Sequence, residues 1–171
     1  MERKGVVTFM GNPLTLVGKE VKVGKKAPVF SALEKDLSEV KLADFKGKVK
    51  IISVTPSLDT PICDLQAKTF EKKAKKLSDS MVIINISMDL PFAIARFSEG
   101  AKIGKIRTLS DHRDASFGNA YGVLIKELRL LARSVFVVDQ SDVLRYVEIV
   151  PEVTNQPDYE KALAEAKKLI Q

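Results

Sequence analysis

Residues 49–66 read VKIISVTPSLDTPICDLQ, and this stretch decides the fold. Its apolar and β-branched beginning predicts a buried strand, which must end at Pro56 because proline cannot donate to a strand ladder. A helix is expected next, over residues 61–78, and the apolar run at 81–88 predicts a second strand. Strand, helix and strand in this order form a βαβ unit, so the two strands are expected to be parallel.

Weaker patterns on either side of this unit predict the other elements. An N-terminal hairpin is expected from residues 6–9 and 14–17, around a Gly-Asn-Pro turn. The remaining expected strands are residues 28–33, 40–45, 106–110, 132–139 and 143–150. Helical segments are expected at residues 91–97, 115–120 and 159–170. We therefore predict one α/β domain over residues 1–171, in which helices flank a central mixed β-sheet.

The composition is that of an ordinary globular chain. Of 171 residues, 45% are hydrophobic and 29% are charged. No apolar run approaches the ~18 residues that a membrane-spanning helix needs. The N-terminus also lacks the apolar core of ~7–15 residues that marks a secretory signal. We therefore expect a cytoplasmic protein with no membrane partner. The cytoplasm keeps thiols reduced, so the cysteine is expected to be a free thiol.

The counts of cysteine, histidine and charge restrict the chemistry further. The one cysteine cannot close an internal disulfide or build a cysteine-rich zinc site, and the one histidine excludes a multi-histidine metal site. Part of the net charge of +6 comes from five lysines in the first expected helix: Lys68, Lys72, Lys73, Lys75 and Lys76. Such lysines can attract nucleic acid. A solvated helix face is the favoured interpretation, because no aromatic residues lie between them to stack on bases, and no nucleic-acid partner is expected.

The position of Cys63 favours a reactive thiol. It lies in the first turn of the expected helix, at the carboxyl end of a strand, where α/β sheets place their sites. Unpaired N–H groups and the helix dipole favour an anion there, and the thiolate is the nucleophilic form of cysteine. Thr60 is close enough in sequence for its hydroxyl to reach the sulfur, and Pro56 and Pro61 stiffen the loop. Asp59 or Thr60 is the expected N-cap of the helix.

These residues alone leave several reactions open. A lone thiolate can attack a peroxide, a disulfide, an acyl group or a phosphate ester, and a buried inert cysteine is the structural alternative. Acyl transfer by cysteine usually needs a histidine base, and the single candidate, His112, lies in a polar turn and is interpreted as a bystander. A phosphatase needs a phosphate cradle after the cysteine, where Asp64 would repel the anion.

A resemblance narrows these alternatives. Pro56-x-x-x-Thr60-x-x-Cys63 has the spacing of the peroxiredoxin active-site motif, and the whole chain resembles the bacterial thiol peroxidases, a subfamily of atypical two-cysteine peroxiredoxins. Further segments that match are residues 11–16, 87–93, 131–133, 150–154 and 157–159. The resemblance implies a thioredoxin-like fold that opens with a β-hairpin. It also implies a homodimer that reduces hydrogen peroxide and alkyl hydroperoxides, with thioredoxin or another thiol as reductant and without a metal or cofactor.

The resemblance also implies a role for each matching residue. Cys63 would be the peroxidatic cysteine, which attacks the terminal peroxide oxygen and becomes a sulfenic acid. Thr60 would hydrogen-bond the peroxide and orient it. Arg133 would hold the thiolate and stabilise the developing charge. Pro56 would shield the sulfur from water and from over-oxidation.

The chain departs from the subfamily at the resolving position. The resolving cysteine is expected after Leu-Pro-Phe-x-x-x-Arg-Phe, and here these residues, 90–97, are followed by Ser98. A serine hydroxyl cannot condense with a sulfenic acid, so the internal disulfide cannot form. Two explanations stay open: a natural one-cysteine variant that an external thiol resolves, or an engineered Cys-to-Ser substitution.

Three other functions compete with a peroxidase. A thiol–disulfide oxidoreductase is disfavoured because Thr60 stands where a Cys-x-x-Cys motif needs its first cysteine. A redox sensor or a chaperone-like holdase could use the same oxidisable Cys63, and repeated turnover with a thiol donor distinguishes a peroxidase from both. A nucleic-acid-binding module is the most distant alternative, and salt-sensitive DNA binding would support it.

Overall fold

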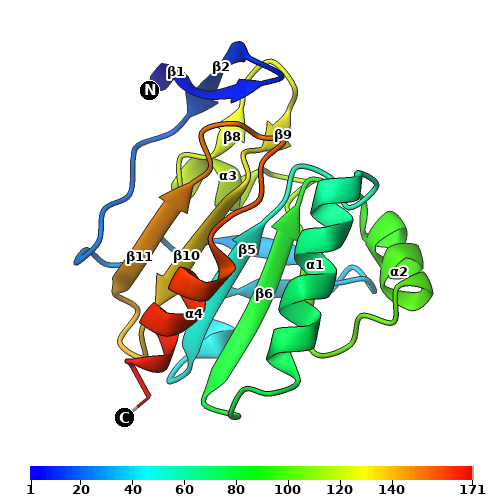
Figure 1. The fold of residues 1–171 in the computed structure, drawn as a ribbon, viewed down its shortest axis with the longest axis vertical. Helices are drawn as coiled ribbons and strands as arrows, with labels where there is room; N and C mark the ends of the chain where they lie inside the picture. Colours follow the sequence, from blue (N-terminus) through cyan, green and yellow to red (C-terminus); the bar gives the residue numbers. More distant parts are fainter. Residues whose placement is uncertain (171) are drawn as a thin grey trace.

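The computed structural model describes residues 1–170, which form two β-sheets and their covering helices (Figure 1). The strands of the larger sheet are β3 (Ser31–Leu33), β4 (Glu39–Lys41), β5 (Val49–Val54), β6 (Met81–Ser87), β7 (Arg107–Ser110), β10 (Ser134–Val138) and β11 (Leu144–Ile149). The smaller sheet contains β1 (Glu2–Phe9), β2 (Asn12–Val17), β8 (Leu124–Ile125) and β9 (Leu130–Leu131). The helices are η1 (Leu42–Phe45, a 3₁₀ turn), α1 (Pro61–Ala74), α2 (Pro91–Gly100), α3 (Ser116–Ala120) and α4 (Tyr159–Lys167). The larger sheet has the order β11-β10-β5-β6-β7-β3-β4, and the smaller has the order β1-β2-β8-β9.

The βαβ unit predicted for residues 49–88 is confirmed. β5 and β6 pair in parallel, with Ile52 opposite Ile84, and α1 is the crossover between them. Every residue of β5 is buried, as a strand covered on both faces must be. β7 continues the parallel arrangement beside β6, whereas β10 pairs with β5 in the antiparallel direction. The central sheet is therefore mixed, as predicted.

Two hydrophobic clusters cover opposite faces of the larger sheet. Ile51 and Ile52 are neighbours on β5 and belong to different clusters, because successive side chains of a strand point to opposite faces. Phe70 of α1 and Leu163 of α4 pack on one face. On the other face, an aromatic group is centred on Phe117. Figure 1 shows α1 and α4 in front of the sheet and α3 behind it.

The predicted N-terminal hairpin is confirmed, but it belongs to a second sheet that the sequence analysis missed. β1 and β2 pair in the antiparallel direction, β8 pairs with β2, and β9 pairs with β8. β8 and β9 have only two residues each, so they carry no alternating pattern of their own. They are strands because β2, from the start of the chain, offers a partner. This sheet lies above the end of β5 in Figure 1.

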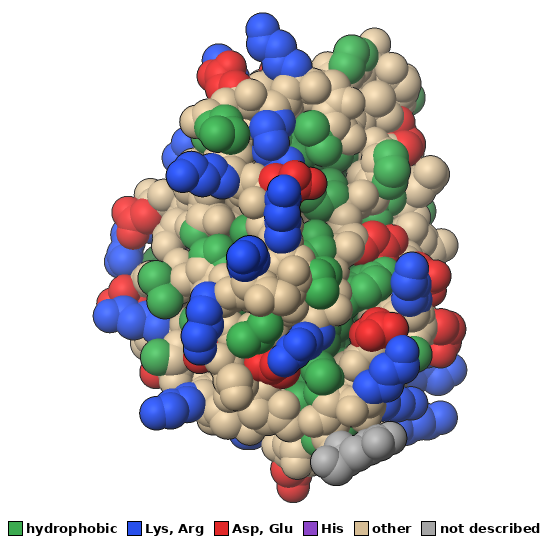
Figure 2. Space-filling view, turned by 90° about the vertical axis from the view of Figure 1, so that its left-hand side faces the viewer, with side chains coloured by type: hydrophobic (Ala, Val, Ile, Leu, Met, Phe, Trp, Pro, Cys, Tyr) green, Lys and Arg blue, Asp and Glu red, His purple; other side chains and the backbone are tan. Residues whose placement is uncertain are grey.

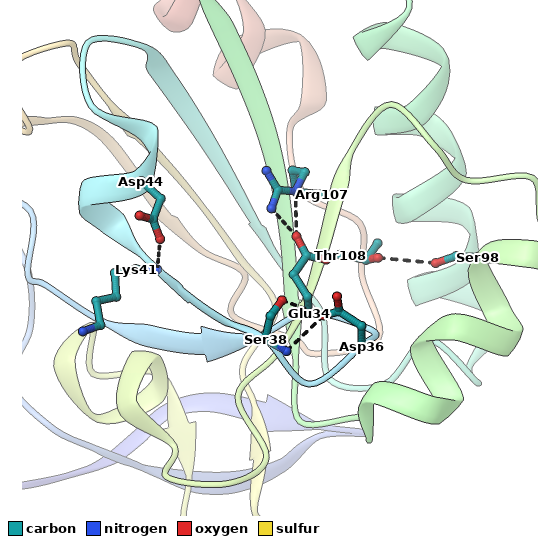
Figure 3. Close-up of polar contacts among 8 residues, drawn as sticks. All are labelled: Glu34, Asp36, Ser38, Lys41, Asp44, Ser98, Arg107 and Thr108. Carbon is teal, nitrogen blue, oxygen red and sulfur yellow. Dashed lines mark hydrogen bonds and ion pairs between the residues drawn. The ribbon is translucent and has the colours of Figure 1, made fainter.

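Several expected boundaries are wrong, and two of the differences have a clear local reason. α1 ends at Ala74, before residue 78, where backbone bonds shorten to the three-residue spacing of a closing turn. The second half of the strand expected at 40–45 is η1, because the Asp44 carboxylate accepts the Lys41 N–H at 2.7 Å and stabilises a helical turn (Figure 3). α2 extends to Gly100 and α4 ends at Lys167.

The five lysines expected in the first helix lie where a solvated helix face requires, three of them in α1 and two, Lys75 and Lys76, directly after its end. Lys68, Lys72, Lys75 and Lys76 are exposed and Lys73 is half-buried. Two of these lysines form ion pairs with carboxylates, Lys68 with Asp64 and Lys73 with Glu160. On the face shown in Figure 2, basic side chains are scattered among hydrophobic, polar and acidic ones. Within residues 1–170, none of the helices has the length and hydrophobicity needed to cross a membrane.

Candidate active site

Cys63 lies in the first turn of α1, directly after the loop that leaves β5. Thr60 is the N-cap and Pro61 the first helical residue, so the second of the two expected N-caps is confirmed. The first backbone bond of the helix runs from the Asp64 N–H to the Thr60 carbonyl. The N–H of Cys63 therefore belongs to the turn whose donors have no partner within the helix. The thiol is fully buried.

Arg133 contacts Cys63 directly. Its side chain comes from the link between β9 and β10, and it is only 2% exposed. Its Nη2 lies 3.3 Å from Sγ of Cys63, and its Nε donates to the carbonyl of Val153 at 2.8 Å. The two residues are 70 positions apart in the chain and meet because β10 pairs with β5.

The Arg133 guanidinium is buried without a carboxylate partner among residues 1–170. Its hydrogen bonds go to the Val153 carbonyl, the Gln66 amide oxygen and the Cys63 sulfur, and none of the ion pairs in this part of the chain includes it. A buried cation is costly unless strong acceptors or an anion compensate it. Of its three acceptors, the Cys63 sulfur is the one that belongs to an ionisable group.

Thr60 is held by a turn that the next strand supports. The Thr60 hydroxyl donates to the Ser57 carbonyl at 2.9 Å, which leaves its lone pairs free to accept. The carboxylate of Asp89, which follows β6, accepts the Ser57 hydroxyl and the Leu58 N–H, each at 2.8 Å. The loop before Cys63 is thus tied to the neighbouring strand. Asp89 was not among the predicted site residues, although it lies in residues 87–93, one of the segments that match the family.

A pocket of about 410 Å³ opens beside these residues, and most of its lining is apolar. The lining consists of Phe9, Pro56, Ser57, Thr60, Pro61, Ile62, Ile125, Leu128, Leu130, Arg133, Val153 and Thr154. These residues come from four separate segments of the chain, including both hairpins of the smaller sheet. Thr60 and Arg133 contribute polar groups to an otherwise hydrophobic wall. Pro56 is buried in it, as a residue that shields the sulfur would have to be.

Tyr159 is an aromatic residue near the site. Its ring packs edge-on against Phe70, with 5.2 Å between the ring centroids. Burial raises the pKa of the Tyr159 phenol, the charge of Arg133 lowers it, and an ionised Cys63 raises it further. Tyr159 is therefore a neutral phenol at neutral pH, within electrostatic reach of both groups.

Two residues singled out from the sequence lie elsewhere. Ser98 is buried on α2, and its hydroxyl pairs with the Thr108 hydroxyl of β7 at 3.3 Å (Figure 3). His112 follows β7, and neither Ser98 nor His112 lines the pocket. Within residues 1–170, no group of three or more His, Cys, Asp or Glu side chains is arranged to hold a metal ion. Pro56, Thr60 and Arg133 line the pocket, whereas Cys63 does not line it and contacts Arg133 directly.

Gln66 belongs to the site and was missed. It is fully buried, and its Oε1 accepts from Nη1 of Arg133 at 2.8 Å. Its Nε2 donates to the Ser53 hydroxyl at 2.8 Å and to the Val54 carbonyl at 3.3 Å. Residues three apart share a helix face, so the spacing from Cys63 was a usable sequence signal for Gln66.

The chain is similar over most of its length to proteins of known family. A model of the Redoxin family matches residues 22–163. The chain is similar to the thiol peroxidase of Bacillus subtilis, with 57% identity over 164 residues, which cover 96% of this chain and 98% of the relative. It is 56% identical to the thiol peroxidase of Halalkalibacterium halodurans over 161 residues, or 94% and 96% of the two chains. The crystal structure of a peroxiredoxin-like protein from Aquifex aeolicus superposes with a TM-score of 0.91 at 40% identity, covering 97% of this chain and 98% of that one.

Proposed function

Because this chain belongs to the Redoxin family and, within it, to the bacterial thiol peroxidases, which are peroxidase oxidoreductases, we propose that it reduces hydroperoxides with Cys63 as the peroxidatic residue. The observation that carries the proposal is the 3.3 Å contact between Nη2 of Arg133 and Sγ of Cys63. A buried cation held against a cysteine in the first turn of a helix favours the thiolate, which is the nucleophile.

The first half-reaction forms a sulfur–oxygen bond and breaks the peroxide bond. The Cys63 thiolate attacks the terminal oxygen of ROOH, in line with the O–O bond. The sulfur becomes a sulfenic acid, and the leaving RO⁻ takes a proton from solvent and departs as ROH. Negative charge moves from the sulfur through the oxygen atoms during this displacement. The Arg133 guanidinium beside the sulfur stabilises that charge without reorganising.

Thr60 and Pro56 prepare the substrate and the sulfur for this step. The hydrogen of the Thr60 hydroxyl is already donated to Ser57, so the oxygen of Thr60 is an acceptor for the peroxide hydrogen. That contact orients the terminal oxygen toward Cys63. Pro56, buried in the pocket wall, keeps water away from the sulfur.

The apolar pocket supports organic hydroperoxides as substrates alongside hydrogen peroxide. A hydrocarbon group that enters a space of about 410 Å³ lined by Phe9, Ile125 and Leu128 leaves water, which favours binding. Hydrogen peroxide has no such group and uses only the polar contacts. We therefore propose that alkyl hydroperoxides are the better substrates.

Because this chain has no second cysteine, the second half-reaction depends on an external thiol. Ser98 cannot form a disulfide, and Cys63 is the one cysteine of the sequence. An external thiolate attacks the sulfenic sulfur and displaces hydroxide, which takes a proton from solvent and leaves as water, so that a mixed disulfide forms. A second thiol then regenerates Cys63 and leaves as the oxidised disulfide. Thioredoxin is the proposed physiological reductant, in agreement with the resemblance.

The intact mass of the reduced protein after one equivalent of cumene hydroperoxide tests the proposal. We expect the rapid gain of one oxygen atom, which a sulfenic-acid reagent traps and which a Cys63→Ser variant does not show. Oxidation no faster than that of free cysteine would rule out an activated thiol. Repeated turnover with a thiol donor then separates a peroxidase from a redox sensor or a holdase, which need only a single oxidation.

The family resemblance also leads us to propose a cytoplasmic homodimer. Light scattering of the purified chain would give twice the monomer mass of 18.9 kDa. A monomer at all concentrations tested would overturn the proposal for the assembly and leave the chemistry at Cys63 unaffected.

A further inference from the structure

Gln66 links the Arg133 side chain to the strand beneath it. Its amide oxygen accepts from Nη1 of Arg133 at 2.8 Å, and its amide nitrogen donates to Ser53 and Val54 of β5. We propose that Gln66 is a positioning residue, which holds the guanidinium against Cys63. Being neutral, it also leaves the thiolate as the one anionic partner of Arg133 within residues 1–170. This inference rests on the function proposed above.

The orientation of the Gln66 amide is dictated by its neighbours. The Ser53 hydroxyl donates its hydrogen to Oδ1 of Asn85 at 3.2 Å, so it presents a lone pair to Gln66. The Val54 carbonyl is also an acceptor. The nitrogen of the amide must therefore face the strand, and the oxygen must face Arg133. These groups are buried, so the network is held rigidly in a medium of low dielectric constant.

A carboxylate at position 66 would reverse the electrostatic effect. Glutamate has the same length as glutamine, and its charge would form a buried ion pair with Arg133. The guanidinium would then be neutralised before the thiolate forms. A negative charge one helical turn from Cys63 would also oppose ionisation of the thiol directly. Glutamate would further lose the donor that reaches Ser53. The amide fits this position because it accepts from Arg133 without adding charge.

Two substitutions at Gln66 separate charge from hydrogen bonding. Gln66→Glu adds the charge, and Gln66→Met keeps the length of the side chain but removes the acceptor. Gln140→Glu is the matched control, because Gln140 is exposed in the turn between β10 and β11, at the other end of the sheet. The readouts are the rate of Cys63 oxidation by cumene hydroperoxide and the ultraviolet absorbance of the thiolate, both measured as functions of pH. Thermal unfolding reports whether each variant is folded.

We expect Gln66→Glu to move the pH midpoint of thiolate formation upward by about one unit, which slows oxidation at neutral pH by about tenfold. At high pH, its rate should approach that of the parent. Gln66→Met should slow oxidation several-fold at every pH, because Arg133 loses its support. Gln140→Glu should match the parent in both readouts. A purely structural role for Gln66 would lower thermal stability without moving the pH profile.

A folded Gln66→Glu protein with the parent's pH midpoint and rate would overturn the inference. Should that variant fail to fold, Gln66→Met decides: an unchanged oxidation rate per folded thiol overturns the positioning role. The parent protein is measured first in the same assay. If its thiol reacts no faster than free cysteine, the proposed peroxidase function fails, which is a different result from equal rates in a reactive parent and its variants.

Discussion

Replacing Arg133 with lysine is expected to slow oxidation of Cys63 by roughly 100-fold. Lysine keeps the positive charge, but a single ammonium group cannot reach the Val153 carbonyl, the Gln66 amide and the sulfur together, as the planar guanidinium does. The measurement is the second-order rate constant with cumene hydroperoxide, followed by rapid mixing. Arg129→Lys, in the exposed turn between β8 and β9, is the control. A rate within threefold of the parent's would show that charge alone suffices.

Asp111 is expected to make the stability depend on pH in the acid range. Its buried carboxylate accepts the N–H groups of Phe117 and Gly118 at 2.9 and 2.8 Å. Burial raises the pKa of Asp111 from 3.8 to about 6, against the lowering effect of these two bonds. The folded protein therefore holds this proton more tightly than the unfolded chain does. The resulting contribution to stability is complete below about pH 4 and is lost as the pH rises through about 6.

Substituting Asp111 with Asn removes this titration. The variant loses an acceptor for one N–H group, so its free energy of unfolding should be lower than the parent's at low pH. Between pH 4 and pH 7, the free energy of unfolding of the parent should fall by about 2–3 kcal/mol relative to that of the variant, because only the parent carries the Asp111 titration. Urea unfolding at several pH values measures both curves. Curves that stay parallel over this range would contradict the raised pKa.

Among the elements, those that the sequence predicted are the ones that carry their own periodic pattern. β5 and β6 are continuous apolar runs, and α1 starts where proline and an N-cap residue predict. β8 and β9 could not be predicted, because two residues become a strand only when a distant partner is in place. The same limit applied at the site, where sequence spacing and resemblance predicted Cys63, Thr60, Arg133 and Pro56. The spacing of Gln66 from Cys63 indicates a shared helix face, but the contacts that give Gln66 and Asp89 their roles join elements that are distant in the sequence.

The Ser98→Cys variant tests whether α2 can bring a resolving thiol to Cys63. The Ser98 side chain is buried against Thr108 rather than lining the Cys63 pocket, so an internal disulfide requires α2 to rearrange. We expect one equivalent of hydroperoxide to add one oxygen to the parent, whereas the variant should lose two hydrogens as the disulfide forms. Disulfide formation should be slower than the oxidation of Cys63 itself. A stable oxygen adduct in the variant would mean that α2 does not make this movement.

At the scale of the whole molecule, the smaller sheet is explained by the pocket that it completes. The larger sheet and α1 supply Cys63 and its polar partners, whereas Phe9 of β1 and residues 125–130 supply one part of the apolar wall and Pro56, Pro61, Ile62 and Val153 supply the rest. Closing that wall requires the start of the chain to pair with a segment more than a hundred residues later. If the proposed function holds, we expect the second sheet to influence which hydroperoxides are bound, and the βαβ unit to supply the reacting thiol.

Leu128→Ser tests this division. Leu128 is 40% exposed at the pocket wall, so its removal should cost little stability and should take apolar contact from the substrate. We expect the rate constant for cumene hydroperoxide to fall roughly fivefold, from the loss of part of a leucine's burial energy. The rate for hydrogen peroxide should stay within twofold of the parent's, since that substrate has no hydrocarbon group. Leu37→Ser, at an exposed leucine between β3 and β4, is the matched control. If the rate constants for both peroxides fell equally, Leu128 would affect the reactivity of Cys63 and not the selection of substrate.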